Sequence, residues 1–255
     1  MNYKDRVYGK YLTTHVIPRE GDITPDTLEG RARVWRRTFK RFLPRNRSAR
    51  LVDLGCGYGS IVWWLQREGF ASASGVDVST EQVEAGKRLG IAGVEQGDIG
   101  EFLRDKKACY DVIFARDILE HFRKEEVLEI LSLCYHSLTE GGLLILQTPN
   151  AESPFYGRIR YGDFTHEIAF TASSLSQLLR MTGFQKMRFY PTPPVINGLE
   201  GLARFALWKV IEAWYKFLIY VEIGRGERIV TQDIITVTEK NFSDGSGKGY
   251  QAGVA

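Results

Sequence analysis

The stretch from Leu51 to Gly59 constrains the fold of this chain more than any other. Its first four residues, LVDL, have the pattern of a buried parallel strand. Glycines follow at positions 55, 57 and 59, and glycine tolerates positive φ and lets a ligand approach the backbone closely. An apolar run from Ile61 then predicts a helix. A strand, a glycine loop and a helix in this order predict a binding loop for a nucleotide-type cofactor.

The spacing of the glycines and the position of Asp53 narrow the choice of ligand. Dinucleotide-binding loops read G-x-G-x-x-G and hold a pyrophosphate, whereas this loop reads G-x-G-x-G. A carboxylate two positions before the first glycine repels a pyrophosphate and attracts an ammonium group. The pattern therefore disfavours a NAD-dependent dehydrogenase and favours S-adenosylmethionine. From this motif alone, a tight turn without a ligand remains the alternative.

The sequence DLGCGYG resembles the first motif of class I S-adenosylmethionine-dependent methyltransferases, and the likeness extends from about Arg50 to Asn150. Asp77 ends the next expected strand, where it can accept hydrogen bonds from ribose hydroxyls. The resemblance implies that Asp98 receives the adenine amino group and that Ile99 packs on the ring. The cofactor would be S-adenosylmethionine, leaving as S-adenosylhomocysteine. The predicted cofactor residues are Asp53, Gly55, Cys56, Gly57, Asp77, Val78, Asp98, Ile99 and Arg116.

Strand and helix patterns alternate through the first 150 residues, which predicts a doubly wound, mostly parallel α/β sheet. We expect strands at 51–54, 73–78, 94–99, 110–115 and 143–147, with a paired-glycine turn at 139–142. The resemblance implies a Rossmann-like sheet of seven strands, the last (228–238) antiparallel between strands five and six. We expect one domain, 1–240, with a helix at 26–44, a cofactor-binding half at 50–150, an acceptor-binding half at 151–240 and a disordered tail at 241–255.

Composition excludes several classes of protein. With 44% hydrophobic and 25% charged residues, the 255-residue chain is typical of globular proteins, and a net charge of +3 is too small to predict a nucleic-acid partner. Three widely separated cysteines predict neither disulfides nor a zinc site, and we expect no metal. The polar N-terminus does not resemble a secretory signal, and no apolar run reaches the ~18 residues of a membrane span. We expect a cytoplasmic protein.

Ionisable residues gather where the acceptor of the methyl group would bind. Asp117 and His121 follow the fourth strand, and their i, i+4 spacing suggests a pair. The loop 149–170 would overhang the transferred methyl group. The run from Asp163 to Thr171, followed by 173–179 and Gly183-Phe184, is similar to small-molecule and glycan O-methyltransferases of this class. Because a hydroxyl acceptor must lose a proton, we predict His166, His121 and Asp117 as catalytic residues, with His166 the first choice as base. The predicted substrate-binding residues are Arg158, Arg160, Tyr161 and Asp163, the arginines as partners of a phosphate or carboxylate.

Three further segments leave alternatives open. In residues 1–25, a lid in the resembled family, Tyr8, Tyr11 and His15 either contact the ligand or only pack. The basic run at 31–50 is a solvated helix face or a contact for an anionic substrate or phospholipid. A helix at 197–221 carries an apolar face and is a lid packed on the domain, a dimer surface or an interfacial membrane helix. The apolar face comprises Leu199, Leu202, Ala203, Ala206, Val210, Ala213, Trp214, Phe217, Tyr220 and Val221.

The sequence therefore predicts a methyltransferase that modifies a hydroxyl or phosphate of a sugar, nucleotide sugar, or lipid-linked or surface glycan in polysaccharide biosynthesis. A quinone- or phenol-type O-methyltransferase is the alternative enzyme, favoured if the pocket is wholly apolar. A non-catalytic adenosine-binding scaffold is the alternative outside enzymes. The expected partners are a small-molecule or glycan acceptor and no nucleic acid. A homodimer, or peripheral contact with the inner face of a membrane through 197–221, would follow from the apolar helix.

Overall fold

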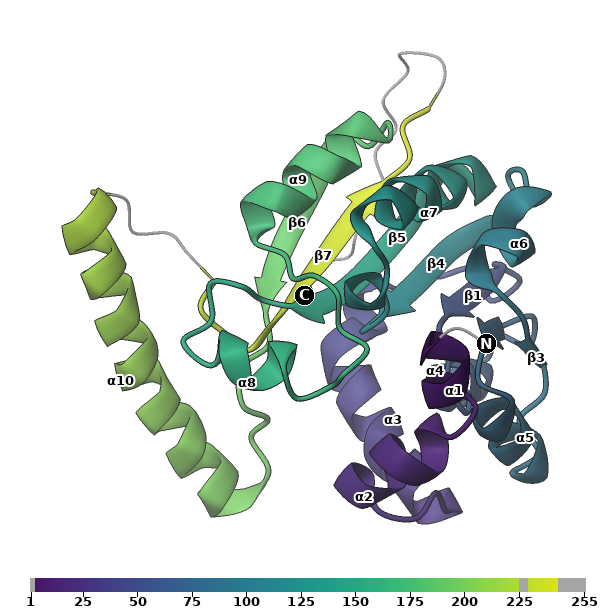
Figure 1. Ribbon diagram of the computed structural model, residues 1–255, viewed down its shortest axis with the longest axis horizontal. Coiled ribbons are helices and arrows are strands. Elements are labelled where there is room, and N and C mark those ends of the chain that lie inside the picture. The colour runs from purple at the N-terminus through teal and green to yellow at the C-terminus, as the bar shows by residue number, and fades with distance from the viewer. Residues whose placement is uncertain (1–2, 225–228, 243–255) are drawn as a thin grey trace.

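The computed structural model describes residues 3–224 and 229–242. Its seven strands form one sheet in the order β3-β2-β1-β4-β5-β7-β6 (Figure 1). The strands are β1 Leu51–Leu54, β2 Ser74–Asp77, β3 Val94–Gln96, β4 Tyr110–Arg116, β5 Leu138–Pro149, β6 Lys186–Pro191 and β7 Asp233–Glu239. Strands β1 to β5 pair in parallel, and β7 runs antiparallel between β5 and β6. The predicted fold class is confirmed.

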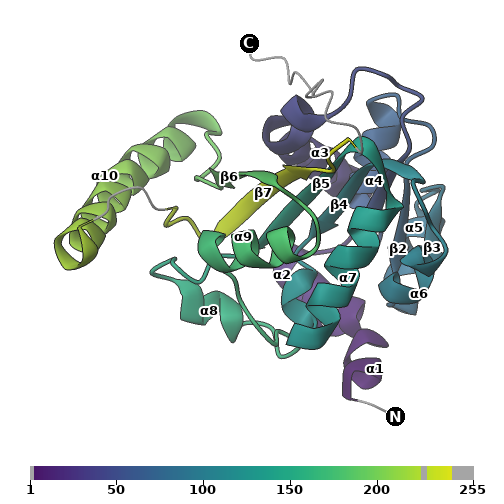
Figure 2. The same ribbon diagram turned by 90° about the horizontal axis from the view of Figure 1, so that it is seen from above.

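Helices cover both faces of the sheet because successive strand residues point to opposite faces. Val112 and Phe114 of β4 pack in a cluster with α3 (Pro25–Phe39) and α4 (Ser60–Arg67). Ile113 and Ala115, which alternate with them, pack with α6 (Ile99–Arg104), α7 (Lys124–Ser137) and α9 (Ala172–Met181) on the other face (Figure 2). Helix α5 (Thr80–Arg88) packs beside α4. This arrangement brings the carboxyl ends of the parallel strands to one edge, where ligands bind in such sheets.

The N-terminal segment folds into short helical pieces: α1 Tyr3–Tyr8, a π-helical turn Leu12–Val16 and α2 Ile17–Glu20. Leu12 and Val16 are buried against Tyr58 and the start of α4. The hydroxyl of Ser79 donates to the Tyr8 carbonyl, at 2.8 Å. Ser79 is the N-cap residue of α5, but its side chain holds the N-terminal segment instead of capping the helix.

Several predicted boundaries were wrong. Residues 139–142 are not a turn, because β5 runs from Leu138 to Pro149 through a register shift opposite β4, and the φ of +72° at Gly141 accommodates the irregularity. The loop 149–170 contains a helix, α8, at Tyr156–Arg160. The last strand begins at Asp233, and Arg228, its predicted start, lies outside the described residues, as do positions 243–255 of the predicted tail. The domain limits stay a prediction.

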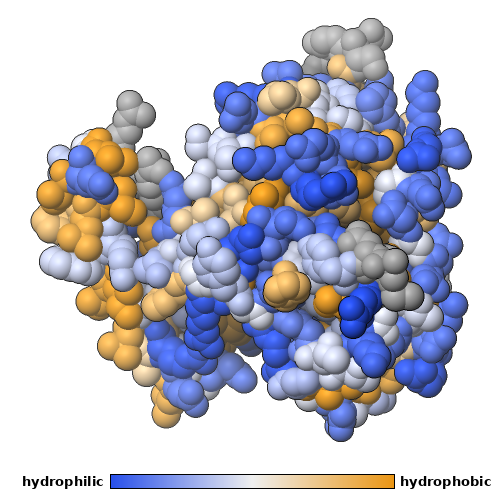
Figure 3. All heavy atoms as spheres, in the orientation of Figure 1, coloured by the Kyte–Doolittle hydropathy of each residue, from blue (hydrophilic) through white to orange (hydrophobic). Residues whose placement is uncertain are grey.

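Helix α10 (Gly198–Ile223) stands away from the sheet and its covering helices (Figures 1 and 2). Its predicted apolar face points to solvent: Leu199 is 87% exposed, Val210 70% and Trp214 58%. Figure 3 shows hydrophobic side chains gathered over this helix. The interpretation of α10 as a lid packed on the domain through this face is therefore wrong. Across the described residues, no helix has the length and hydropathy needed to cross a membrane.

Candidate active site

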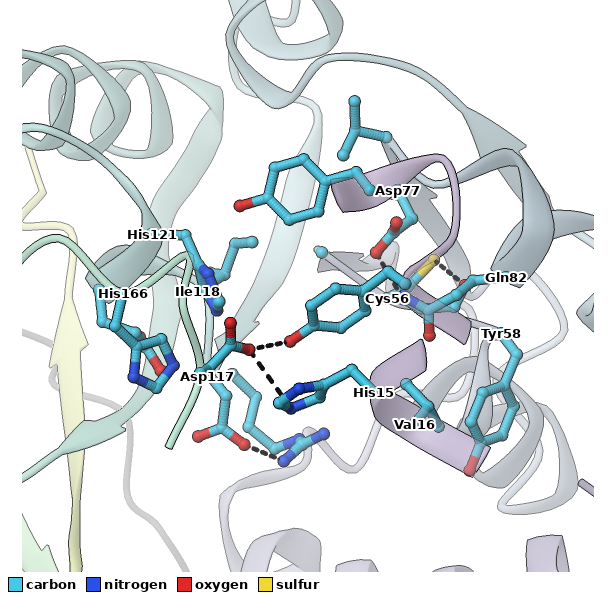
Figure 4. Close-up of a pocket in the computed structure, with 18 of the residues that line it drawn as sticks. His15, Val16, Cys56, Tyr58, Asp77, Gln82, Asp117, Ile118, His121 and His166 are labelled. Atoms are coloured by element: carbon cyan, nitrogen blue, oxygen red, sulfur yellow. Dashed lines mark hydrogen bonds and ion pairs between the residues drawn. The ribbon is translucent and has the colours of Figure 1, made fainter. Parts of the chain in front are cut away.

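A pocket of about 700 Å³ opens at the carboxyl edge of the parallel strands. Its walls come from the N-terminal helices, the glycine loop, the ends of β2 and β4, the loop after β5 and the start of β7 (Figure 4). Eight of the nine predicted cofactor residues line it: Gly55, Cys56, Gly57, Asp77, Val78, Asp98, Ile99 and Arg116. The size is within the range of about 300–1,000 Å³ that is usual for small-molecule sites.

The glycine loop is held in a conformation that requires glycine. Gly55 and Gly57 have φ of +69° and +57°. A Cβ on Gly57 would lie 2.8 Å from Oε1 of Gln82, and one on Gly55 would lie 2.7 Å from Cδ1 of Ile118. A side chain at either position would therefore be strained by the positive φ and would have to displace Gln82 or Ile118. The loop presents its bare backbone to the pocket.

The residues around Asp77 suit an adenosine. One Asp77 carboxylate oxygen accepts the Gly57 amide and the other the Ser79 amide, each at 2.8 Å, so the carboxylate is fixed at the strand end. Val78 follows it and is 48% exposed, which leaves an apolar surface for a ring. Asp98 caps α6 by accepting the Glu101 amide, at 3.0 Å. These groups fit the ribose and adenine of S-adenosylmethionine.

Asp53 is the predicted cofactor residue that does not line the pocket. Its neighbours Val52 and Leu54 face the layer of α7, so Asp53 points to the opposite face and is only 3% exposed. One carboxylate oxygen has no hydrogen-bond partner among the described residues. Burial raises the pKa of Asp53 to about 7, although the charge of Arg116 opposes the shift. The direct contact expected between Asp53 and an ammonium group is therefore not formed by this geometry.

The predicted pairing of Asp117 with His121 was also wrong. Asp117 has φ of +51°, and only a 3₁₀ turn, Leu119–His121, follows it, so the i, i+4 geometry of an α-helix does not exist here. The Asp117 carboxylate instead binds the guanidinium of Arg116 and accepts the side-chain amide of Gln147, at 3.1 Å. Asp117 and His121 both line the pocket, but each has different partners.

His121 and His166 lie together on one side of the pocket, away from Cys56 and Asp77 (Figure 4). Their ring centroids are 4.7 Å apart with the planes at 73°. The Thr165 hydroxyl donates to Asp163, at 2.7 Å, and so accepts from Nδ1–H of His121, at 2.8 Å. His166 donates Nδ1–H to the Ile159 carbonyl, at 3.1 Å. Both rings therefore keep a free Nε2 lone pair. Burial lowers the pKa of His121 to about 4 and also lowers the pKa of His166.

Asp163 ties the N-terminal segment to the acceptor side. Its carboxylate accepts the Tyr11 hydroxyl and lies 3.3 Å from Nε2 of His15. Although burial opposes the shift, hydrogen bonds from Tyr11 and Thr165 lower the pKa of Asp163 to about 2. The rings of Tyr11 and His15 stack at 4.8 Å. Tyr8, Tyr11 and His15 all line the pocket, so the N-terminal segment forms one of its walls.

The other three predicted substrate residues do not line the pocket. Arg160 donates to the carbonyls of His166 and Glu167, and it therefore holds the loop in place. Arg158 and Tyr161 point to solvent, and Tyr161 is 80% exposed. The predicted arginine contacts with an anionic acceptor were wrong for this pocket, because the backbone carbonyls of the same loop occupy the Arg160 guanidinium.

Two carboxylates that line the pocket, Asp233 and Glu120, were not among the predicted site residues. Asp233 begins β7 opposite Pro149, and burial, reinforced by the charge of Asp117, raises its pKa to about 7. The predicted antiparallel last strand could have revealed it, because such a strand starts at the edge where the parallel strands end. Glu120 is fully buried, neither carboxylate oxygen has a hydrogen-bond partner among the described residues, and burial raises its pKa well above the usual value.

The known proteins that resemble this chain are methyltransferases. A family model described as a methyltransferase domain matches residues 28–188. The tRNA U34 carboxymethyltransferase of Vibrio atlanticus (strain LGP32) is 29% identical over 167 residues, which are 60% of this chain and 50% of the relative. The chain thus spans about half the length of the curated relatives it matches.

Solved structures share the fold. An S-adenosylmethionine-dependent methyltransferase from Archaeoglobus fulgidus superposes with a TM-score of 0.61 at 21% identity, covering 84% of this chain and 97% of that one. Phosphoethanolamine N-methyltransferase 2 from Haemonchus contortus, in complex with S-adenosyl-L-methionine, gives 0.59 at 16% identity, covering 92% and 60%. The predicted enzyme class and cofactor are thereby confirmed. The chain belongs to the methyltransferase domain family and has the class I fold of enzymes that use S-adenosylmethionine.

Proposed function

We propose that this protein transfers the methyl group of S-adenosylmethionine to a hydroxyl of a sugar or glycan. The observation that carries the proposal is the pair His121 and His166, whose free Nε2 lone pairs lie on the acceptor side of the pocket. A hydroxyl placed there can donate its hydrogen to an imidazole nitrogen. The cofactor supplies an activated methyl group, so the chain has to orient the acceptor and receive its proton.

The charges around the pair bear on which acceptor is methylated. Asp117, Glu120, Asp163 and Asp233 all line the pocket and offer hydrogen-bond acceptors to a ligand rich in hydroxyls. The carboxylate of Asp163, whose pKa is lowered to about 2, would repel a phosphate at the reacting end, and Arg158 and Arg160 do not line the pocket. We therefore favour a neutral sugar hydroxyl over a phosphate. A quinone- or phenol-type acceptor is disfavoured because the pocket is not wholly apolar.

A tRNA acceptor is the second candidate, because the matched curated relatives are named tRNA U34 carboxymethyltransferases. The exposed arginines on and after α3 offer a basic surface for phosphates. The expectation of no nucleic-acid partner is therefore open to test. The acidic lining of the pocket supports the glycan assignment over this one.

The experiment uses labelled cofactor and four sets of acceptors: neutral sugars and glycans, nucleotide sugars, phenols and unmodified tRNA. Amines of similar size form a fifth set that separates O- from N-methylation. We expect labelled product with the first set and a shift in melting temperature with S-adenosylhomocysteine. Product only with tRNA, phenols or amines would replace the glycan assignment. S-adenosylhomocysteine binding without product in any set would favour the adenosine-binding scaffold.

We also propose that α10 contacts an anionic lipid surface. Its exposed face carries Trp214 and Tyr220 among aliphatic residues, as interfacial helices do. Arg37, on α3, donates to the Ile196 carbonyl just before α10, at 3.1 Å. Cationic α3 and apolar α10 are therefore joined at this point, which supports attraction to acidic headgroups. A second copy of the chain is the competing occupant.

Sedimentation with vesicles of acidic and of neutral phospholipid tests this proposal. We expect binding to acidic vesicles that falls with salt and is lost when Trp214 and Phe217 are both replaced by Glu. A second tryptophan, Trp63 on α4, is unsuitable as a control because it packs against the core and Trp63→Glu would disturb that core. The matched control is therefore the exposed polar pair on α10, Glu200→Gln and Arg204→Gln. A concentration-dependent dimer that Trp214→Glu dissociates, without vesicle binding, would replace the lipid with a second copy.

A further inference from the structure

Three metal-ligating side chains meet on the acceptor side of the pocket. One ligand atom from each of Glu120, His121 and His166 lies within 4.8 Å of the other two. Glu120 and His121 are buried, and His166 is partly buried. We propose that these residues bind a divalent transition-metal cation such as Zn²⁺, Mn²⁺ or Co²⁺. The sequence did not reveal this site, because His166 comes from a different loop and no short metal-binding motif is present.

The hydrogen bonds of the two rings favour this assignment. Thr165 and the Ile159 carbonyl each accept Nδ1–H from one imidazole, which orients the rings and leaves Nε2 available. Histidine ligands of metals usually donate their second ring N–H to a carbonyl, carboxylate or other acceptor in this way. Thr165 is itself fixed by Asp163, at 2.7 Å. The site therefore has the supporting hydrogen bonds of a metal centre.

Glu120 provides an independent observation. Its side chain is 0% exposed, it lines the pocket, and neither carboxylate oxygen has a hydrogen-bond partner among the described residues. A buried carboxylate without a partner costs free energy, whereas a cation would compensate it. Coordination explains why a carboxylate lies next to two neutral imidazoles.

The ligand set selects the kind of cation. Two imidazoles and one carboxylate suit first-row transition metals, whereas Mg²⁺ and Ca²⁺ prefer oxygen ligands. Bonds of about 2.0–2.2 Å in a tetrahedral site place ligand atoms about 3.3–3.6 Å apart, so ligand atoms that lie within 4.8 Å of one another approach by up to about 1.5 Å when the cation binds. Three protein ligands leave a position open, as in catalytic metal sites.

The role of the cation rests on the proposed function. The acceptor hydroxyl oxygen would occupy the open position, where the cation makes the hydroxyl more acidic. Because the cation occupies the Nε2 lone pairs, the imidazoles do not receive the proton when it is bound; the O–H bond breaks and the proton passes to water instead. The oxygen then forms a bond to the methyl carbon while the carbon–sulfur bond breaks, and neutral S-adenosylhomocysteine leaves. His121 and His166 thus act on the hydroxyl indirectly, because they hold the cation that binds its oxygen.

Metal binding is tested on the full chain after removal of metals with EDTA. We expect Zn²⁺ to raise the melting temperature and to bind with a stoichiometry of one in calorimetry, and Co²⁺ to give visible absorption bands. Glu120→Gln and His166→Gln should each weaken Zn²⁺ binding at least about tenfold. The matched control is His136→Gln, an exposed histidine on α7, which should leave binding unchanged.

S-adenosylhomocysteine binding shows that each variant is folded. Glu120→Gln keeps the shape of the side chain and removes only one carboxylate oxygen, so this variant should bind S-adenosylhomocysteine within about twofold of wild type. The proposal is overturned if Zn²⁺, Mn²⁺ and Co²⁺ do not bind, or if binding survives in both Glu120→Gln and His166→Gln. Full methyl transfer to glycans by EDTA-treated protein would overturn the cation's role while leaving the proposed function. Metal binding without glycan methylation would overturn the proposed function, and with it the cation's role, while leaving the metal site.

Discussion

The imidazole rings of His121 and His166 meet edge to face, with centroids 4.7 Å apart, although one follows β4 and the other lies in the loop after β5. The backbone joins these two segments as well, since the amide of Glu167 donates to the carbonyl of Glu120, at 2.7 Å. Both rings and the Glu120 carboxylate line one side of the pocket, whereas the glycine loop and Asp77 line the cofactor side. The site therefore separates an adenosine-binding half from an acceptor-binding half.

Replacing Asp77 with Asn should weaken S-adenosylhomocysteine binding about tenfold or more. The amide NH₂ would face the Gly57 or Ser79 amide that the carboxylate now accepts, and a lost hydrogen bond to a charged group costs about 1.5–3 kcal/mol. Calorimetry measures the affinity. Asp105→Asn, at an exposed position after α6, is the matched control and should bind like wild type.

Gly57→Ala should abolish cofactor binding and destabilise the fold more than Gly90→Ala does. Both glycines have positive φ, +57° and +74°, which costs an alanine about 1–2 kcal/mol. Only at Gly57 would the new Cβ also approach Gln82, to 2.8 Å, since Gly90 has open space. Urea denaturation and S-adenosylhomocysteine titration compare the two variants. If the two variants lost equal stability and Gly57→Ala still bound S-adenosylhomocysteine, the cofactor would not approach the Gly57 backbone closely.

Asp53 should make the protein less stable as pH rises. Burial raises its pKa from 3.8 to about 7, so between these values the unfolded chain carries the charge and the folded chain does not. The unfolded state then binds fewer protons, and the free energy of unfolding falls with pH until about 7. Urea titrations from pH 5 to 8 should show a flatter pH dependence for Asp53→Asn than for wild type. Parallel curves for the two proteins would rule out this ionisation.

Arg160→Ala should lower the rate of methyl transfer about tenfold, whereas Arg158→Ala should change it less than about twofold. Arg160 holds the carbonyls of His166 and Glu167, so its loss frees the loop that carries His166. Arg158 is exposed and does not line the pocket. Turnover and KM are measured for both variants, because a fall in turnover reports the loss of the His166 position whereas a rise in KM reports weaker binding of the acceptor. A rise in KM shared by both arginine variants would instead restore the anionic acceptor that the sequence suggested.

The sequence by itself determined the sheet and the cofactor half of the site. Three local patterns carry this information: strand periodicity, the glycines at 55 and 57, and acidic residues at successive strand ends. Because the strands are parallel, the sheet brings these strand ends together at one edge. The acceptor half depended on contacts between segments far apart in the chain. Residues at i, i+4 spacing did not pair, because the positive φ of Asp117 changes the direction of the chain.

Only the tertiary structure decided which polar groups face the pocket and which face the backbone. Arg160 is bound to carbonyls of its own loop, and Asp53 is buried on the face of β1 opposite Val52 and Leu54 and does not line the pocket. The outward direction of the apolar side of α10 likewise depends on how the chain leaves β6, which helical periodicity does not specify. Hydrophobic periodicity shows which residues share one face of a helix or strand. What that face packs against is set by packing and desolvation across the whole fold.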